Sequence, residues 1–178
     1  RLIPARPEAH LYEVECTVPF PDPAGQRFAL PAWIPGSYLV RDFAKHVVSI
    51  RARSGRREVP LVKLDKNTWQ AAPCEGPLTV SMEVYAWDLS VRGAHLDTSH
   101  AFFNGTSVFL RVIGQETRRC EVELVRPAGR RYAAWRVATA MRRKQARPYD
   151  FGLYQAADYD ELIDHPVEMG TFTLASFK

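Results

Sequence analysis

Apolar residues recur at every second position in several stretches of the chain. These stretches are residues 12–18, 79–86, 108–112 and 120–124. In the first of them the apolar positions are Tyr12, Val14, Cys16 and Val18. Because successive side chains of a β-strand point to opposite faces of its sheet, this period of two predicts strands that are buried on one face.

Turn-forming residues separate the alternating stretches. Clusters of Gly, Pro, Asn, Asp and Ser occupy residues 21–26, 54–57, 65–68, 73–77 and 127–129. Asn104 and Gly105 stand between two apolar segments, and this dipeptide tolerates the positive φ angles that a two-residue hairpin turn requires. We therefore expect a β-hairpin centred on Asn104 and Gly105.

One short helix is expected near the C-terminus, in residues 158–166. Asp158 can cap its first turn, Glu161 follows three residues later, and Pro166 ends it. The sequence after Pro166 alternates again and predicts a strand that continues toward residue 178, as if a further domain followed. The expected fold class is all-β: an antiparallel β-sandwich of seven or more strands in a single domain, residues 1–178, with a barrel as the alternative.

Composition and charge narrow the function classes. The 178 residues are 46% hydrophobic and carry a net charge of +4, and much of the basic surplus lies in residues 118–147. Acidic residues elsewhere offset this surplus, and no alternation of aromatic and basic residues suggests a platform for stacked bases, so we expect no nucleic-acid partner. No apolar run reaches the 18 residues of a membrane span. Three cysteines without C-x-x-C spacing predict buried free thiols and favour a cytoplasmic location.

The chain contains none of the short motifs of a self-contained enzyme. H-E-x-x-H, G-x-S-x-G, a P-loop and G-x-G-x-x-G are all missing. His95, Asp97 and His100 form the one cluster of metal-ligand types, in HLDTSH. It could grip a zinc ion, but a third firm ligand and a general base are missing, and histidines that cap turns explain the residues equally well. We therefore expect neither catalytic residues nor a metal site.

Residues 30–47, LPAWIPGSYLVRDFAKHV, are too apolar for an ordinary surface loop and too interrupted for a helix or a long strand. Their candidate site residues are Trp33, Tyr38, Arg41 and Asp42. An arginine can clamp a carboxylate, and a tyrosine hydroxyl can orient a peptide. In the alternative interpretation, which spacing alone favours, the two aromatic residues cover the edge of the sandwich and Arg41 pairs with a buried acid.

Glu168 is a further candidate, because it lies in the apolar sequence HPVEMG. An unpaired acid is costly to bury, so we expect a cationic partner. An internal arginine, a group on a neighbouring domain and the amine of a ligand all remain open as that partner.

Four blocks of the sequence resemble the N-terminal domain of the glycyl aminopeptidase family of zinc metallopeptidases. They are LPAWIPGSYLVRDFAKHV (30–47), DKNTW (65–69), VRGAHLDTSHAFFNGTSVFL (91–110) and ADYDELIDHPVEMGTF (157–172). The resemblance implies a parent protein with this β domain, a thermolysin-like catalytic domain that holds zinc, and a PDZ domain. It also implies that this chain holds no cofactor and is inactive alone.

The resemblance further suggests how the candidate residues act. Segments 33–42 and 164–170 would face the catalytic domain, where Glu168 would hold the free amine of a peptide and Tyr38 with Arg41 would shape the wall of the cleft. An apolar surface should be exposed where the catalytic domain sits. The alternatives are a stand-alone module that binds peptide or carbohydrate through exposed aromatic residues, and a binder of anionic polymers.

Overall fold

The computed structural model describes residues 1–34, 36–37, 39–175 and 177. The strands are β1 (Leu2–Arg6), β2 (Leu11–Val18), β3 (Arg27–Ala29), β4 (Val47–Ser54), β5 (Arg57–Val59), β6 (Leu61–Lys63), β7 (Thr68–Ala71), β8 (Leu78–Tyr85), β9 (Ala94–Leu96), β10 (His100–Phe103), β11 (Arg111–Val112), β12 (Cys120–Leu124), β13 (Arg136–Thr139), β14 (Arg142–Arg143), β15 (Gly152–Ala156) and β16 (Val167–Gly170). The helices are the 3₁₀ turns η1 (Pro7–Ala9), η2 (Phe43–His46), η3 (Gly105–Ser107) and η4 (Arg130–Tyr132), and the α-helix α1 (Tyr159–Asp164).

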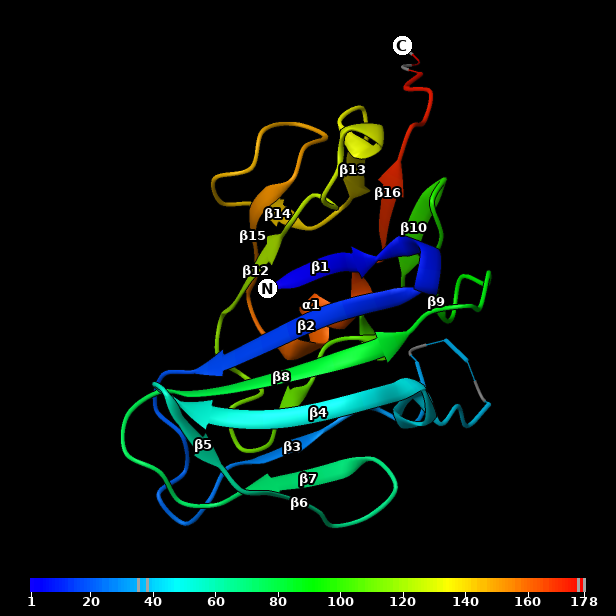
Figure 1. Ribbon diagram of the computed structural model, residues 1–178. Coiled ribbons are helices and arrows are strands. Elements are labelled where there is room, and N and C mark those ends of the chain that lie inside the picture. The colour runs from blue at the N-terminus through cyan, green and yellow to red at the C-terminus, as the bar shows by residue number, and fades with distance from the viewer. Residues whose placement is uncertain (35, 38, 176, 178) are drawn as a thin grey trace.

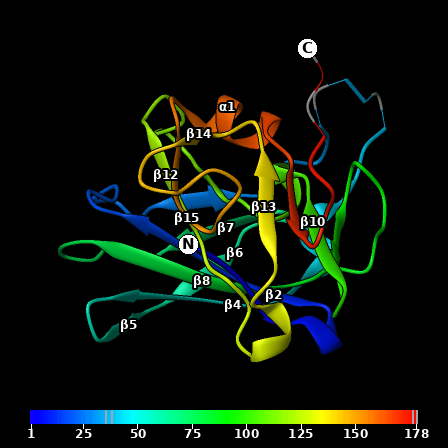
Figure 2. The ribbon, with the colours of Figure 1, turned by 90° about the horizontal axis from the view of Figure 1, so that it is seen from above.

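The strands form three sheets that enclose one hydrophobic core (Figures 1 and 2). The largest has the order β14-β15-β12-β1-β2-β8-β4-β5, and the two smaller ones have the orders β13-β16-β10-β9 and β11-β3-β7-β6. All strand pairs are antiparallel except β1 with β12, which run parallel with Leu2 opposite Leu124. The predicted all-β, sandwich-like fold is confirmed.

The alternating stretches form strands where one face of a sheet meets the core. In β2, Tyr12, Val14 and Val18 are buried while the residues between them are more exposed. β8 shows the same alternation along its length, and β12 shows it at Val122 and Leu124. The three cysteines are free, as predicted, but each is only half-buried.

The hairpin predicted at Asn104 and Gly105 is wrong. Asn104 instead caps η3, its side-chain oxygen accepting hydrogen bonds from the backbone N–H of Thr106 at 3.2 Å and from its hydroxyl at 2.6 Å. Gly105 is needed for close packing: a Cβ there would lie 2.8 Å from Cα of Ile163 in α1. Close packing against α1, rather than the geometry of a hairpin turn, is therefore the reason that a glycine stands at position 105.

The strand predicted for residues 108–112 is also mostly wrong. Val108, Phe109 and Leu110 are all buried in succession, and only Arg111 and Val112 form the short β11. Burial on all sides removes the distinction between faces, so the apparent alternation carried no information here. At the C-terminal end, the predicted strand is limited to β16.

The predicted helix is confirmed as α1. Asp158 caps it, and its carboxylate accepts a hydrogen bond from the Glu161 N–H at 2.8 Å. The Glu161 carboxylate in turn accepts a hydrogen bond from the N–H of Ala157, the residue before the cap, so the two side chains satisfy backbone donors on both sides of the helix start. None of the helices among the described residues is long and apolar enough to span a membrane.

The hydroxyl of Tyr12 links two of the sheets. Tyr12 lies in β2 and is fully buried, and its hydroxyl lies 2.9 Å from the carbonyl oxygen of His95 in β9 and 3.3 Å from that of Phe102 in β10. The sheet that contains β9, β10 and β16 is therefore held against the largest sheet by a buried polar contact as well as by apolar packing.

Candidate functional site

The segment that contains the first candidate residues is anchored at both ends. Leu30 and Asn67 exchange two hydrogen bonds, from Leu30 N–H to the Asn67 carbonyl at 3.0 Å and from Asn67 Nδ2 to the Leu30 carbonyl at 2.8 Å. At the other end Asp42 forms an ion pair with Lys66 at 2.7 Å. Two sequence blocks far apart in the chain are thus brought together.

Between these anchors, Trp33 points outward and is 58% exposed. Tyr38 lies outside the described residues. Arg41 is half-buried, and its Nε has no hydrogen-bond partner among the residues that the structure describes. The ion pair with a buried acid that one interpretation gave to Arg41 is likewise not found within the described part of the chain.

Glu168 lies on the outer face of the sheet β13-β16-β10-β9, opposite Phe102 in β10 and Ala138 in β13. It is half-buried and forms no ion pair with the described residues. Burial raises the pKa of Glu168, and the nearby His100 only partly offsets this effect. Within the described part of the chain the carboxylate therefore has no close cationic partner of the kind that burial calls for.

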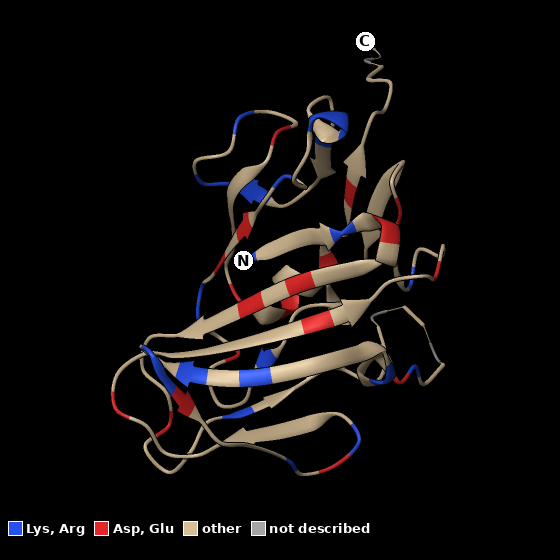
Figure 3. Ribbon diagram, in the orientation of Figure 1, with Lys and Arg blue, Asp and Glu red and all other residues tan. Residues whose placement is uncertain are grey.

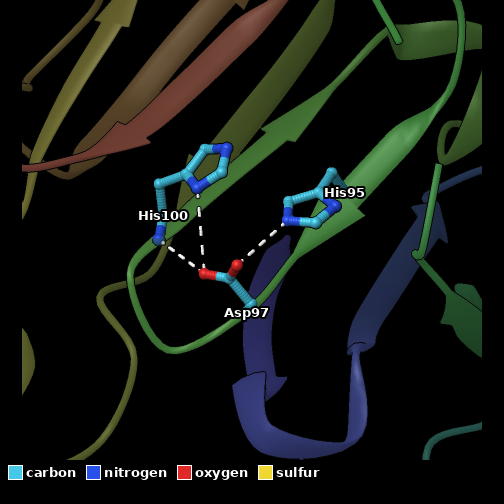
Figure 4. A group of neighbouring side chains, drawn as sticks. All are labelled: His95, Asp97 and His100. Atoms are coloured by element: carbon cyan, nitrogen blue, oxygen red, sulfur yellow. Dashed lines mark hydrogen bonds and ion pairs between the residues drawn. The ribbon is translucent and has the colours of Figure 1, made fainter. Parts of the chain in front are cut away.

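Asp97 organises the turn between β9 and β10 (Figure 4). Its Oδ1 accepts hydrogen bonds from the Ser99 N–H and hydroxyl, both at 2.6 Å, and from the His100 N–H at 3.0 Å, while Oδ2 lies 3.2 Å from Nε2 of His95. Partial burial would raise the pKa of Asp97, but these hydrogen bonds outweigh it and hold the pKa well below its usual range. The carboxylate therefore acts as a charged cap for the turn.

The candidate ligand atoms of His95, Asp97 and His100 lie within 4.8 Å of one another, and no other such group occurs within the described ranges. The two imidazole rings stack, with centroids 4.8 Å apart. Stacked rings face each other, whereas a shared metal ion must lie in the plane of both rings, and one oxygen of Asp97 already accepts three hydrogen bonds. The arrangement suits the turn-capping interpretation better than a zinc site.

The stack continues beyond these two histidines. Trp87 packs on the other side of His95 at 5.0 Å and against His10 at 3.9 Å, which gives a column of four rings: His10, Trp87, His95 and His100. His10 donates a hydrogen bond from Nδ1 to the Leu96 carbonyl at 2.7 Å. Sequence reasoning missed this column, because no periodic pattern connects residues so far apart.

One side of the molecule combines these features. The described residues of the 31–42 segment, the β8–β9 connection, β10, β16 and residues 171–175 lie on the same side in both views (Figures 1 and 2). Large exposed apolar residues of these segments are Trp33, Leu39, Val40, Trp87, Leu89 and Val91. We call this side the docking side. Exposed apolar residues also occur elsewhere, among them Phe20, Val48 and Val62, so contact of this side with a catalytic domain stays a prediction.

Most basic residues of 118–147 lie elsewhere, around β12, β14 and η4 (Figure 3), whereas Arg136 lies in β13 opposite Gly170 of β16. Some are paired within the chain: Lys144 with Glu121, and Arg126 with Asp150 at 2.7 Å. These pairs reduce the charge available to an anionic polymer.

Comparison with known proteins identifies the chain. The family described as Peptidase M61 N-terminal domain matches residues 1–171. The chain belongs to this family. Its fold is similar to an aminopeptidase N family protein from Idiomarina loihiensis, with a TM-score of 0.95 and 42% sequence identity over 99% of this chain. No curated protein matches.

The M61 N-terminal domain described here spans only 30% of the length of the Idiomarina protein, which is therefore much longer. The family resemblance drawn from the four sequence blocks is confirmed. The blocks meet in space as well: blocks one and two join through Asp42 and Lys66, and blocks three and four pair as β10 and β16.

Proposed function

We propose that this chain is the non-catalytic N-terminal domain, residues 1–178, of a zinc-dependent aminopeptidase, and that its docking side packs on the catalytic domain and shapes the substrate cleft. Family membership and the length of the Idiomarina relative support a larger parent protein. The exposed apolar residues of the docking side support contact with another domain.

The observation that carries the proposal is the half-buried carboxylate of Glu168, which forms no ion pair with the residues that the structure describes. An aminopeptidase must recognise the free amine at the end of its substrate, and a carboxylate that is partly removed from water binds an ammonium group more strongly than an exposed one. Glu168 is the anchor for that amine, while Arg41 and Trp33 form the wall around it. Tyr38 shares this role in the proposal.

The zinc ion belongs to the parent's catalytic domain in this proposal, and a PDZ domain follows it. The one candidate ligand group of the described residues caps a turn, so no step of the reaction is assigned to this chain. Its partners are the catalytic domain and the N-terminus of a peptide. The free thiols of Cys16, Cys74 and Cys120 are consistent with a cytoplasmic location.

The test uses both the 178-residue chain and the longer natural polypeptide. The chain alone should not hydrolyse glycyl-p-nitroanilide, and the polypeptide should carry an H-E-x-x-H helix and hydrolyse it. In the polypeptide, Glu168→Gln should raise KM about tenfold or more, the effect of losing one charged hydrogen bond. The control Glu58→Gln removes an exposed carboxylate on β5 and should leave KM unchanged. Hydrolysis by the chain alone would refute the proposal.

The exposure of Trp33 favours one second candidate, a stand-alone module that binds peptide or carbohydrate. In that case Trp33→Ala would abolish ligand binding by the isolated chain without changing its melting temperature. If the isolated chain binds no such ligand, and Trp33→Ala instead weakens association with the catalytic domain, the accessory-domain proposal is favoured.

A further inference from the structure

A small polar cavity lies on the docking side between the segment Val40–His46 and the β8–β9 connection, with η3 beside it. Its volume is about 260 Å³, and its polar lining residues are Arg41, Asp42, Lys45, His46, Asp88 and Ser107. Arg41 comes from the first family block and Ser107 from the third, so residues more than sixty positions apart in the sequence meet at one cavity.

The walls of this cavity are held by backbone contacts. The Arg41 N–H donates to the Ala32 carbonyl at 2.5 Å, which fixes the segment that carries the guanidinium. The Asn104 N–H donates to the Gly93 carbonyl at 2.9 Å, and this bond joins η3 to the β8–β9 connection. Gly93 permits close approach of Asp88, because a Cβ at residue 93 would lie 2.4 Å from Oδ2 of Asp88. The cavity is therefore a built feature of the fold.

Two hydrogen-bonding groups at this cavity lack a partner. Ser107 is only 4% exposed, and neither its Oγ nor the buried Nε of Arg41 has a hydrogen-bond partner among the described residues. In the described part of the chain only one other buried side-chain nitrogen or oxygen lacks a hydrogen-bond partner, and it is Nδ1 of His95. Leaving a buried donor unsatisfied costs free energy, so two such groups at one cavity indicate a missing acceptor.

The charges around the cavity select the kind of acceptor. Arg41 and Lys45 are cationic, and Asp42 is already paired with Lys66. Burial and the neighbouring Lys45 lower the pKa of His46, with Asp88 acting in the opposite direction, so neutral His46 adds no charge at pH 7.

The remaining acid, Asp88, would repel a doubly charged phosphate more strongly than a singly charged anion. The planar edge of a guanidinium matches the two oxygens of a carboxylate. We propose that this cavity binds a carboxylate group, with the Arg41 guanidinium and the Ser107 hydroxyl as its hydrogen-bond donors. The carboxylate belongs either to a small free acid or to an Asp or Glu side chain of an adjoining polypeptide, and both sources present the same chemistry to the cavity.

The test is an NMR titration of the ¹⁵N-labelled 178-residue chain at constant ionic strength. The first probe is acetate, with neutral acetamide as its isosteric control. The second is the blocked peptide acetyl-Gly-Asp-Gly-amide, with its Asn counterpart as control. We expect saturable shifts of the Arg41 and Ser107 amide signals with a carboxylate probe and none with its neutral control. Binding of acetate without binding of the peptide identifies a small-acid site, and binding of the peptide, with or without acetate, identifies a site that admits a side chain.

Variants of the chain assign the donors. Arg41→Gln should weaken binding at least about tenfold, or about 1.4 kcal/mol, and Arg41→Lys should weaken it less, because the charge remains but the planar fork is lost. Ser107→Ala should weaken it several-fold without loss of folding. Arg56→Gln, in an exposed turn away from the cavity, is the charge-matched control and should bind as the unsubstituted chain does.

The proposal would be overturned by equal shifts with the charged and the neutral probes, or by the lack of a saturable shift with either carboxylate. It would also be overturned if the Arg41 variants bound as tightly as the unsubstituted chain. No hydrolysis is measured, so these outcomes are separate from those that test the aminopeptidase proposal.

Discussion

Removing the Tyr12 hydroxyl tests how the sheets are held together. The substitution Tyr12→Phe keeps the buried ring and its edge-to-face contact with Phe103, whose centroid lies 5.8 Å away. It deletes only the hydroxyl that reaches the carbonyl oxygens of His95 and Phe102. A buried hydrogen bond contributes about 1 kcal/mol, and an acceptor left unsatisfied adds about 1 kcal/mol or more. We therefore expect a loss of about 2 kcal/mol in the free energy of unfolding.

Urea unfolding followed by circular dichroism measures this loss directly. For a chain of this length, about 2 kcal/mol corresponds to a fall in Tm of about 4–8 °C. Tyr85→Phe is the matched control. Tyr85 lies in β8, the strand paired with β2, is 41% exposed, and has no hydroxyl hydrogen bond with the described residues. If Tyr12→Phe changes stability no more than this control, about 0.5 kcal/mol or less, the hydroxyl does not link the sheets as described.

Three further predictions concern single residues. Burial raises the pKa of Glu168, so the folded state holds the carboxyl proton more tightly than the unfolded state does. As pH rises above the usual glutamate range, the ionised carboxylate therefore destabilises the folded state. Glu168→Gln should therefore raise Tm at neutral pH and lose this advantage near about pH 4, while the exposed Glu58→Gln should show no such pH dependence in a thermal melt. Gly105→Ala should cost about 1–3 kcal/mol in urea unfolding, because the new Cβ would lie 2.8 Å from the α1 backbone; a neutral result would contradict the close approach of η3 to α1. Burial raises the pKa of Cys16 and of Cys120 to about 11, so at about pH 8 both should react with iodoacetamide much more slowly than free cysteine. Rapid modification of either residue, located by mass spectrometry, would contradict the raised pKa values.

The sequence predicted strands well where one face of a sheet is buried and the other is exposed. β8 satisfies this condition along its full length, and β2 satisfies it except at Cys16, which is only half-buried. The prediction failed at Val108–Leu110, where the chain passes through the core and every side chain is buried. It failed again at Gly105, because this glycine is required by close packing against α1, and no local pattern reveals contact with an element so distant in the sequence.

The candidate site shows the same division between local and distant information. Glu168 could be chosen as a candidate from the sequence, because an acid in an apolar strand is unusual by itself, and its role stays a prediction. Ser107 was missed, since a serine beside a turn is ordinary until the fold places it at the cavity with Arg41. The family blocks marked both regions but did not show that they meet.

The parallel contact of β1 with β12 divides the largest sheet into two parts. Leu2 opposite Leu124 is the register pair between the two strands, and the Val125 N–H donates to the Leu2 carbonyl at 3.0 Å. β2, β8 and β4, by contrast, are paired along most of their lengths. Such a short junction is a seam along which partial unfolding can begin. In native-state hydrogen exchange the Val125 amide would then open before those of β8, and the seam would separate a late-assembling half of the sheet from an early one.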